Sequence, residues 1–316
     1  MRTLAALSGP HGRALSPFTK LHYNSLVRLF FRHPTRAVSG LLFLFPFAGF
    51  SPAQQAPNPA GARILILPRK LVTGERATLA VLDVNGRLTP GVNVAFSYGE
   101  KVQTDTTGRA MFVAPLNPGT IQAGIEGRSG RVSSTILAPL NMPSALEVVT
   151  EAPRVASVSD RFELAGHGFC GDADANRVTI AGQSALVLAS SPAFLAVLPP
   201  SELNPGPAQV KVSCGQKSAD PFTIVFVSLE LEASNASLAP GEHRSLAVRV
   251  RGSTAKITLE ARNLSPESTE LVGGDAVRAT SSGGAENVAK FELVGKKRGS
   301  FTVSIRLIAP RSTPRP

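Results

Sequence analysis

The two cysteines of the chain, Cys170 and Cys214, are the side chains best suited to covalent or metal chemistry. Two thiols in one short segment can form a disulfide, bind a metal or provide a reactive nucleophile. Neither His167 nor His243 lies at a metal-ligand spacing from a cysteine, which argues against zinc. Since the start of the chain indicates export, as described below, we predict a disulfide between Cys170 and Cys214. A reactive thiol or a metal pair is the alternative.

A short acidic stretch offers oxygen ligands at alternate positions, Asp172, Asp174 and Asn176. This spacing matches the first half of a calcium-binding loop, which makes these three residues a weak calcium candidate. The rest of the loop departs from the pattern. Its sixth position is Arg177 where glycine is needed, and its twelfth is Gln183 where a bidentate glutamate is needed. A polar turn that leads into a strand explains the stretch without a metal.

Catalytic arrangements find little support in the sequence. A nucleophile needs a histidine base nearby, and beyond the N-terminal segment the chain offers only His167 and His243, both in expected turns. The carboxylates are scattered, although a glycosidase needs two that face each other. No glycine-rich phosphate loop follows a strand and opens a helix. We therefore expect no catalytic residue, no cofactor and no enzymatic activity.

The N-terminal segment predicts export. An apolar run at residues 37–50 follows a basic segment at residues 28–36, and small residues come next. This order is typical of a secretory signal peptide, which we place at residues 1–53 with cleavage after Ala53, or after Ala56 as a second choice. The run is shorter than the ~20 residues of a membrane-spanning helix. An uncleaved signal anchor is the alternative; otherwise the mature chain is periplasmic, on the cell surface or extracellular, with no membrane span.

The charge balance argues against nucleic-acid binding. The net charge of the whole chain is +11, but six basic and no acidic side chains lie in residues 1–53, so the exported part carries +5. Its lysines and arginines are dispersed, with residues 296–298 the one tight cluster. The chain has no tryptophan, and Tyr98 is the one tyrosine after the signal segment. A single-stranded nucleic acid would need a basic stripe with stacking aromatics, whereas an anionic surface or polysaccharide stays compatible with this charge.

Beyond the signal segment the pattern predicts strands throughout. Short runs rich in Val, Ile, Leu and Thr alternate with turn residues, and no long helical period occurs. In residues 248–251 two valines alternate with two arginines, as in a half-buried strand. The pair Asn85-Gly86 predicts a hairpin turn. The fold class is therefore all-β, with tandem immunoglobulin-like sandwiches. Clear strand candidates are residues 63–67, 77–82, 92–96, 208–212 and 301–305.

Two breaks divide the exported chain into three segments of sandwich size. The first break is a proline-containing stretch at residues 138–143, and a softer one lies near residues 228–231. The expected organisation is a linker at residues 54–61, sandwiches at 62–138, 146–228 and 229–310, and a disordered tail at 311–316.

The middle segment contains GHGF at residues 166–169 and VTIAG at residues 178–182. These match the G-x-G-F turn and the V-x-I-x-G strand of the IPT/TIG family of immunoglobulin-like domains, which the segment resembles. An alternating strand that ends in proline, FLAVLP at residues 194–199, and GPAQVKV at residues 206–212 follow in the family's order. The opening departs from it, since residues 157–161 replace the usual Pro-x-x-Gly. The resemblance covers nearly the whole segment and implies binding or scaffolding.

The first segment contains VAF at residues 94–96 and TDTTGRAMF at residues 104–112. The second stretch matches a turn that joins two strands in bacterial Ig-like or regulatory-type sandwiches, which the segment resembles. We expect a tight hairpin there, in which Gly108 supplies the positive φ and Asp105 caps the turn. The third segment resembles no family, although its pattern also predicts a sandwich.

Together these observations predict an exported, non-catalytic protein that serves as a cell-envelope spacer or as a protein-interaction or adhesion module. The alternative is a carbohydrate-binding accessory protein, although the absence of tryptophan disfavours a sugar-stacking platform. The partner would be another envelope protein or a polysaccharide, and not a nucleic acid. The loops at residues 168–176 and 202–207 are the candidate binding regions.

Overall fold

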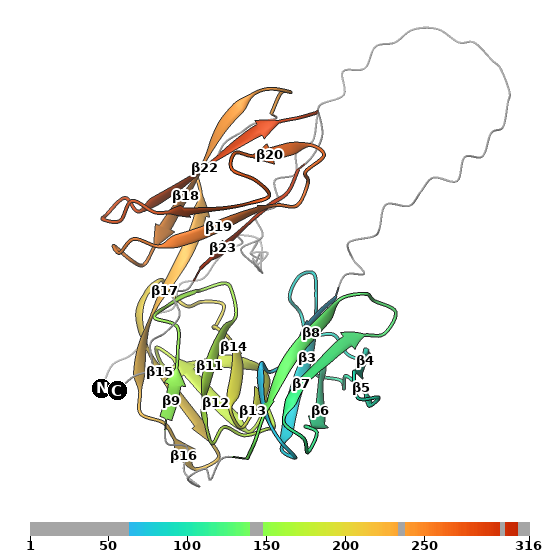
Figure 1. Cartoon of the computed structure of the whole chain (residues 1–316). Coiled ribbons are helices and arrows are strands. Elements are labelled where there is room, and N and C mark those ends of the chain that lie inside the picture. The colour runs from blue at the N-terminus through green and yellow to red at the C-terminus, as the bar shows by residue number, and fades with distance from the viewer. Residues whose placement is uncertain (1–62, 140–147, 233–237, 298–300, 309–316) are drawn as a thin grey trace, which may run out of the picture.

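The computed structural model describes residues 63–139, 148–232, 238–297 and 301–308. The predicted signal peptide, the linker at residues 54–61 and the tail at residues 311–316 lie outside these residues, as does most of the break at residues 138–143. Every regular element in the described part is a β-strand, and the strands form three sandwiches, here called first, second and third in chain order (Figure 1). The protein is all-β, with an immunoglobulin-like sandwich architecture, as the alternating apolar runs predicted.

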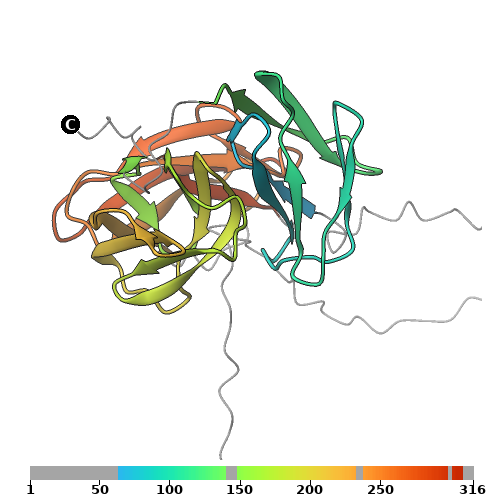
Figure 2. The same cartoon turned by 90° about the horizontal axis from the view of Figure 1, so that it is seen from below.

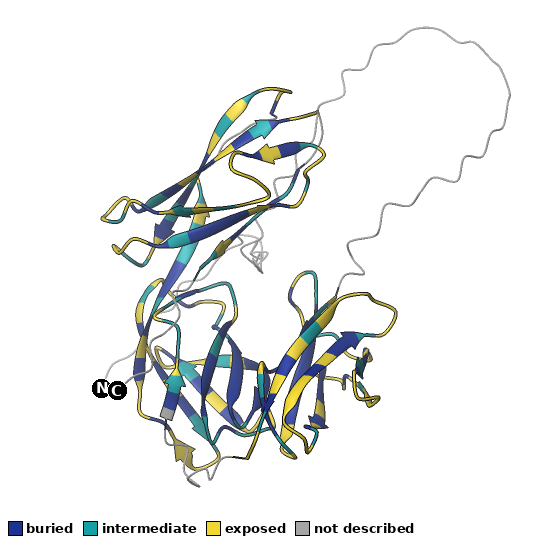
Figure 3. Ribbon diagram, viewed as in Figure 1, coloured by how far each residue is buried: buried dark blue, intermediate teal, exposed yellow. Residues whose placement is uncertain are grey.

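The first sandwich encloses a core of aliphatic side chains and two phenylalanines. The rings of Phe96 and Phe112 come from opposite sheets, and their centroids lie 4.8 Å apart. Leu71, Leu79 and Val94 are fully buried beside them. Figure 3 shows buried and exposed positions along the strands of this sandwich. One sheet consists of β1 (Arg63–Ile66), β3 (Arg76–Asp83) and β6 (Arg109–Val113), and the other of β2 (Lys70–Val72), β8 (Arg131–Leu137), β7 (Gly119–Ile125), β4 (Asn93–Phe96) and β5 (Lys101–Gln103).

The predicted hairpin around Gly108 is wrong in its pairing. Strand β5 pairs with β4 and strand β6 pairs with β3, so the turn crosses from one sheet to the other. The turn chemistry is as expected: the Asp105 carboxylate accepts hydrogen bonds from the backbone of Thr107 and Arg109. Gly108 has a φ of +76°, and a Cβ there would lie 2.5 Å from the backbone nitrogen of Thr89. The motif specified a turn but could not specify which sheet the next strand joins.

The second sandwich uses one strand in both of its sheets. Strand β13 (Gln183–Ser191) pairs with β12 through residues 183–185 and with β14 from Leu186 onward, with an irregularity between Val187 and Ala189. The buried ring of Phe169 and the edge-to-face pair Phe162–Phe226 fill the core between the sheets. The other strands are β9 (Val148–Glu151), β10 (Val155–Ser157), β11 (Phe162–His167), β12 (Asn176–Ile180), β14 (Phe194–Leu198), β15 (Gly206–Cys214), β16 (Lys217–Ser218) and β17 (Phe222–Leu231).

The third sandwich packs two sheets around Leu259, Leu271 and Leu293. In its strand β18 the valines Val248 and Val250 are buried, whereas Arg249 and Arg251 lie on the other face, which confirms the predicted alternation. One sheet contains β18 (His243–Arg251), β22 (Val288–Gly295) and β20 (Thr269–Leu271), and the other contains β21 (Ala276–Thr280), β19 (Thr258–Asn263) and β23 (Val303–Leu307).

The second and third sandwiches share a strand. The first half of β17 pairs with β15 of the second sandwich, through Phe222–Phe226, and its last four residues pair with β18 of the third. The strand therefore continues without interruption through residues 228–231, where the sequence suggested a soft break. In Figure 1 it is the long strand that rises from the second sandwich into the third.

The first and second sandwiches share a core of their own. Strand β3 of the first meets β13 of the second at the pair Thr78–Ser190. The side chains of Ile66 and Leu82 are buried against Leu188 and Phe194 in this shared core. Figure 2 shows the first sandwich directly beside the second. The second sandwich is thus the centre of the molecule, joined to each neighbour by a different kind of contact.

Candidate functional site

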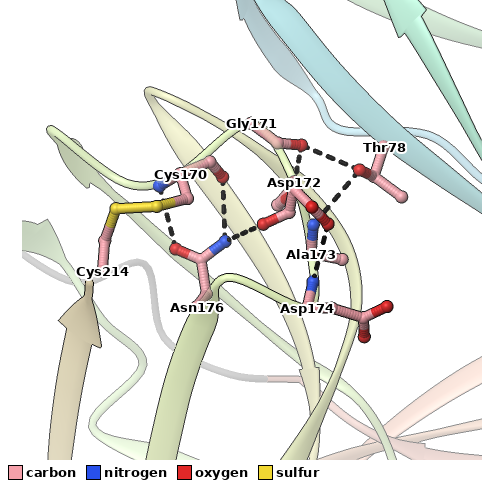
Figure 4. The surroundings of a disulfide bond; sticks show 9 residues. Thr78, Cys170, Gly171, Asp172, Ala173, Asp174, Asn176 and Cys214 are labelled. Atoms are coloured by element: carbon pink, nitrogen blue, oxygen red, sulfur yellow. Dashed lines mark hydrogen bonds between the residues drawn. A yellow bond between two sulfur atoms is a disulfide. The ribbon is translucent and has the colours of Figure 1, made fainter.

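The disulfide predicted from the two cysteines is present in the second sandwich. Cys170, after strand β11, and Cys214, at the end of β15, have Cα atoms 5.6 Å apart, which is the ordinary range for a disulfide (Figure 4). Asn176 lies directly opposite Cys214 in the sheet. Its side-chain amide donates to the carbonyls of Cys170 and Asp172 and accepts from the Cys170 amide, all at 2.8–2.9 Å. The disulfide and Asn176 together fix the conformation of residues 168–176, here called the acidic loop.

The three side chains of the calcium candidate do not converge. Asp172 accepts a hydrogen bond from the backbone nitrogen of Asp174, while Asn176 is engaged with the loop backbone. Figure 4 shows the Asp174 carboxylate pointing away from the loop. Its Oδ1 lies 2.7 Å from Nη1 of Arg109 in the first sandwich. Among the described residues, no group of three or more His, Cys, Asp or Glu side chains could hold a metal ion. The polar stretch therefore serves the protein's own packing.

The acidic loop is the contact that the second sandwich makes with the first. The carbonyl of Gly171 accepts hydrogen bonds from the hydroxyls of Thr78, at 2.8 Å, and Ser190, at 2.7 Å. The Thr78 hydroxyl in turn accepts a hydrogen bond from the backbone nitrogen of Ala173. A Cβ at position 171 would lie 2.1 Å from the carbonyl oxygen of Arg76. Only glycine permits so close an approach of the two backbones.

Arg109 is the charged residue of this contact that the sequence did not single out. Its side chain is 7% exposed; Nη1 donates to Asp174 and Nη2 donates to the Val187 carbonyl at 2.7 Å. Its Nε is buried without a partner. The residue stands in the quoted turn motif, but its position there gave no sign that a neighbouring sandwich would cover it.

The second candidate loop, at residues 202–207, also contacts a neighbouring sandwich. A Cβ at Gly252 of the third sandwich would lie 2.6 Å from Pro205 and 2.7 Å from the backbone nitrogen of Gly206. Leu203 is buried in the core of the second sandwich. Both loops chosen from the sequence as candidate binding regions therefore lie at junctions between sandwiches.

The two histidines differ in environment. His167 is the last residue of strand β11, half-buried, with a buried Nδ1 that has no hydrogen-bond partner. This corrects the expectation that it lies in a solvated turn. His243 is exposed at the start of β18 in the third sandwich. The two histidines thus belong to different sandwiches and do not share a site.

A cleft of about 760 Å³ lies where the three sandwiches meet. Arg69 and Lys70 of the first sandwich form one wall, and Arg306 of the third lies on another. Ion pairs join the first and second sandwiches at its rim, from Arg69 to Glu163 at 2.8 Å and from Lys70 to Glu151 at 3.4 Å. Residues far apart in the sequence build this cleft, so no local motif could have indicated it.

Arg306 also belongs to a cluster of arginines around a buried carboxylate. The side chain of Glu260 is 6% exposed, and its Oε1 accepts from Arg306 Nε at 2.9 Å. Arg278 Nε lies 3.2 Å from Oε2, and Arg262 lies 3.6 Å from Oε1. Burial alone would raise the pKa of the Glu260 carboxyl, but the hydrogen bonds from Arg306 and Arg278 outweigh it and lower that pKa below its usual value.

Comparison with known proteins gives no family. No family model matches the chain, and no curated protein matches it significantly. The IPT/TIG resemblance of the middle segment therefore stays a prediction.

Similar solved structures do exist. A glycan-utilisation protein of Bacteroides ovatus, SGBP-B in complex with a mixed-linkage heptasaccharide, is 13% identical over 76% of this chain and 73% of its own, with a TM-score of 0.33. SGBP-B of a xyloglucan utilisation locus in Bacteroides uniformis is 9% identical over 81% and 99%, with a TM-score of 0.27. Immunoglobulin domains 1–4 of Sidekick-1 are 11% identical over 74% and 76%, with a TM-score of 0.24. At these values the similarities carry no argument about function.

Proposed function

We propose that the protein is an exported, non-catalytic, immunoglobulin-like spacer or interaction module of the cell envelope. The disulfide Cys170–Cys214 supports the location, because such bonds persist in oxidising compartments outside the cytoplasm. The apolar N-terminal run supports export to the periplasm, the cell surface or the medium. No helix capable of crossing a bilayer occurs among the residues that the structure describes.

The single observation that carries the spacer role is the continuity between the sandwiches. The second sandwich shares strand β17 with the third and a buried polar and apolar contact with the first. Ordinary tandem domains are joined by exposed linkers and move relative to one another. Here the connections bury side chains on one side and continue a strand on the other, which favours a fixed spacing between the ends of the molecule.

We infer a non-catalytic role from the positions of the side chains that could do chemistry. The half-buried His167 and the exposed His243 lie in different sandwiches, and both cysteines are in the disulfide. The buried carboxylate of Glu260 accepts hydrogen bonds from Arg278 and Arg306, which makes it a poor base and a poor nucleophile.

We further propose that the second sandwich is of the IPT/TIG type and the first of a bacterial Ig-like type. In the quoted G-x-G-F turn, Gly168 has a φ of +83° and Phe169 is buried in the core of the second sandwich. Gly168 thus provides the left-handed backbone conformation of the turn, and Phe169 contributes its ring to the core. The proposed bounds remain residues 62–138, 146–228 and 229–310, with the strand β17 crossing the last boundary.

Fractionation of cells that produce the full chain tests the location. Each fraction is treated with a thiol-alkylating reagent of high mass, with and without prior reduction. We expect the shorter, processed chain outside the cytoplasm, with Cys170 and Cys214 alkylated only after reduction. A full-length cytoplasmic chain whose thiols react directly would overturn the proposal.

Distances between spin labels test the spacer role. The exposed residues Ser129, Ser201 and Ala285, one in each sandwich, can be changed to cysteine in pairs and labelled without reducing the native disulfide. We expect a narrow distance distribution for every pair. A broad distribution between the labels at 201 and 285 would contradict the fixed connection through β17.

The alternative is a carbohydrate-binding accessory protein. The cleft at the junction and the arginines beside it are the observation that favours this second function. Since the chain has no tryptophan, sugar recognition here would rest on charge and hydrogen bonds in place of stacking.

A further inference from the structure

The outward face of the sheet β21-β19-β23 carries an excess of positive charge. Arg262, Arg278 and Arg306 surround the single carboxylate of Glu260, and their side chains are 52–67% exposed. Residues 229–308 contain eleven Lys and Arg against nine Asp and Glu. The net charge of the third sandwich therefore equals the excess on this one face, and the rest of the sandwich is balanced.

Glu260 holds two of these arginines in place. Neighbouring strands bring them to it, since Glu260 is opposite Arg278 on β21 and opposite Arg306 on β23. Hydrogen bonds to the buried carboxylate restrict the two guanidinium groups, whose outer edges remain exposed. An arginine that is already ordered loses less conformational entropy when it binds an anion, and its planar fork matches a carboxylate or a sulfate.

The arginine face continues into the cleft between the sandwiches. Arg306 belongs to both, because it bonds to Glu260 and lines the cleft. Arg161, from the turn before β11, lies in the same cleft next to Asp160, whereas Arg69 and Lys70 of the first sandwich pair there with Glu163 and Glu151. Arg161 and Arg306 thus carry positive charge from the open sheet face into a concave junction, a path that a chain-like anion would follow.

We propose that this surface, defined by Arg161, Arg262, Arg278 and Arg306, binds a linear acidic polysaccharide whose carboxylate or sulfate groups pair with the arginines. The side chains between the arginines on the sheet face are small or hydroxylated, namely Thr258, Ala276, Thr280 and Ser304. A protein partner would use an aromatic or large apolar anchor. The outward-facing positions of β19, β21 and β23 hold none, and the exposed Leu264 lies beyond the end of β19. The hydroxyl groups of this face and the planar guanidinium groups can hydrogen-bond to the hydroxyls and carboxylates of a sugar chain.

The inference deepens the proposed function, because it supplies a ligand for an envelope protein, and it rests on that function only for the location. The proposed location and the proposed ligand can be disproved independently. The fractionation experiment decides where the chain resides, whereas binding is measured on purified protein in solution.

The test uses the exported chain, purified in its oxidised form, with fluorescently labelled polygalacturonate as the probe. We expect binding at low ionic strength that weakens as salt is added, because exposed charges are screened. Neutral dextran should not bind. No binding of polygalacturonate at low salt would overturn the proposal.

The first variant is Arg161→Gln combined with Arg262→Gln. Arg262 lies 3.6 Å from Glu260 Oε1, beyond hydrogen-bond distance, so the double variant keeps the hydrogen bonds that Arg278 and Arg306 donate to Glu260. The double variant should bind polygalacturonate about tenfold more weakly, with an unchanged melting temperature. A second variant, Glu260→Gln with Arg278→Gln and Arg306→Gln, removes the cluster without leaving a buried charge, and it should lose a similar amount of binding.

The matched control is Lys296→Gln combined with Lys297→Gln. These lysines follow strand β22 of the opposite sheet and pair with Glu270 and Glu267, so the net charge falls by the same amount on another face. The control should bind within about twofold of the original protein. An equal loss in the control would mean nonspecific attraction to net charge, and equally tight binding of polyglutamate or single-stranded DNA would overturn the choice of a polysaccharide.

Discussion

Arg109 Nη1 of the first sandwich lies 2.7 Å from Asp174 Oδ1 of the second, in a pair whose members differ sharply in exposure. The arginine side chain is 7% exposed and the aspartate side chain is 69% exposed. The cost of burying charge therefore falls on the arginine alone. Among the residues that the structure describes, its guanidinium has Asp174 and the Val187 carbonyl as acceptors, and its Nε has none.

Because Arg109 is buried, we predict that removing its exposed partner Asp174 lowers the free energy of unfolding more than removing an ordinary surface ion pair would. Asp174→Ala leaves a buried cation with one acceptor and should lower the free energy of unfolding by about 1–3 kcal/mol. Arg109→Met removes the buried charge and keeps most of the apolar stem, while Asp174 stays in water, so it should cost less. Urea denaturation of both variants checks the order. A larger loss for Arg109→Met would show that the cation itself stabilises the junction.

Gly171→Ala should force the first and second sandwiches apart. The added Cβ would lie 2.1 Å from the Arg76 carbonyl oxygen, which is backbone and cannot rotate away. We expect a loss of about 2–3 kcal/mol in the free energy of unfolding, measured in urea, as for other overpacked sites. Gly130→Ala is the control, because nothing lies within 4 Å of its Cβ position. Equal stability of the two variants would mean that the close approach is not maintained in solution.

Loss of the disulfide should destabilise the second sandwich. The bond joins residues separated by 44 positions, and closing a loop of that length stabilises the folded state by about 4 kcal/mol in the chain-entropy model, an upper figure. The double variant Cys170→Ser and Cys214→Ser should lose a large part of that. Chemical denaturation of the variant, and of the original protein with and without reductant, gives the measurement; indifference to reductant would contradict the prediction.

Calcium should leave the melting temperature unchanged. Asp174 is paired with Arg109, and Asn176 is bonded to the loop backbone, so the candidate ligands would have to leave protein partners to coordinate the ion. Thermal unfolding with excess calcium and with a chelator checks this. A rise in melting temperature that depends on calcium concentration would restore Asp172, Asp174 and Asn176 as ligands.

Acid should weaken the third sandwich through Glu260. Hydrogen bonds from Arg306 and Arg278 lower the pKa of its carboxyl from the ordinary 4.5. A carboxyl whose pKa is lower in the folded than in the unfolded chain adds stability above the unfolded value, and that stability is lost as the pH falls through the folded pKa. The melting-temperature difference between the original protein and Glu260→Gln should therefore shrink below about pH 4.5. Glu267→Gln, at an exposed position, is the control and should show no such convergence.

The sequence predicted the local features and not the contacts between sandwiches. Val248 and Val250 alternate with arginines, which predicted a half-buried strand, and Gly108 with Asp105 predicted a turn. Both features follow from neighbouring residues in the sequence. The disulfide followed from the small number of cysteines and the export signal. These features depend on residues near one another in the chain or on the compartment.

The junctions could not be predicted, for a physical reason. Arg109 in its turn motif has the same local pattern whether water or a neighbouring sandwich covers it. Gly171 has an ordinary φ, so its role in close approach depends on Arg76, ninety-five positions away. The role of Glu260 depends on Arg278 and Arg306, and only strand pairing brings these arginines next to it. The composition of the acidic loop drew attention to it, but nothing in its sequence indicated that a neighbouring sandwich would contact it.

Strand β17 has a mechanical consequence. A pulling force applied to the third sandwich enters the second along one continuous backbone, which is held sideways by β15 and β10 at its start and by β18 at its end. The hydrogen bonds on these flanks would be loaded together, in shear, and would not open one after another like a zipper. A molecule anchored at one end and bound at the other would thus carry tension through its middle without first extending a linker.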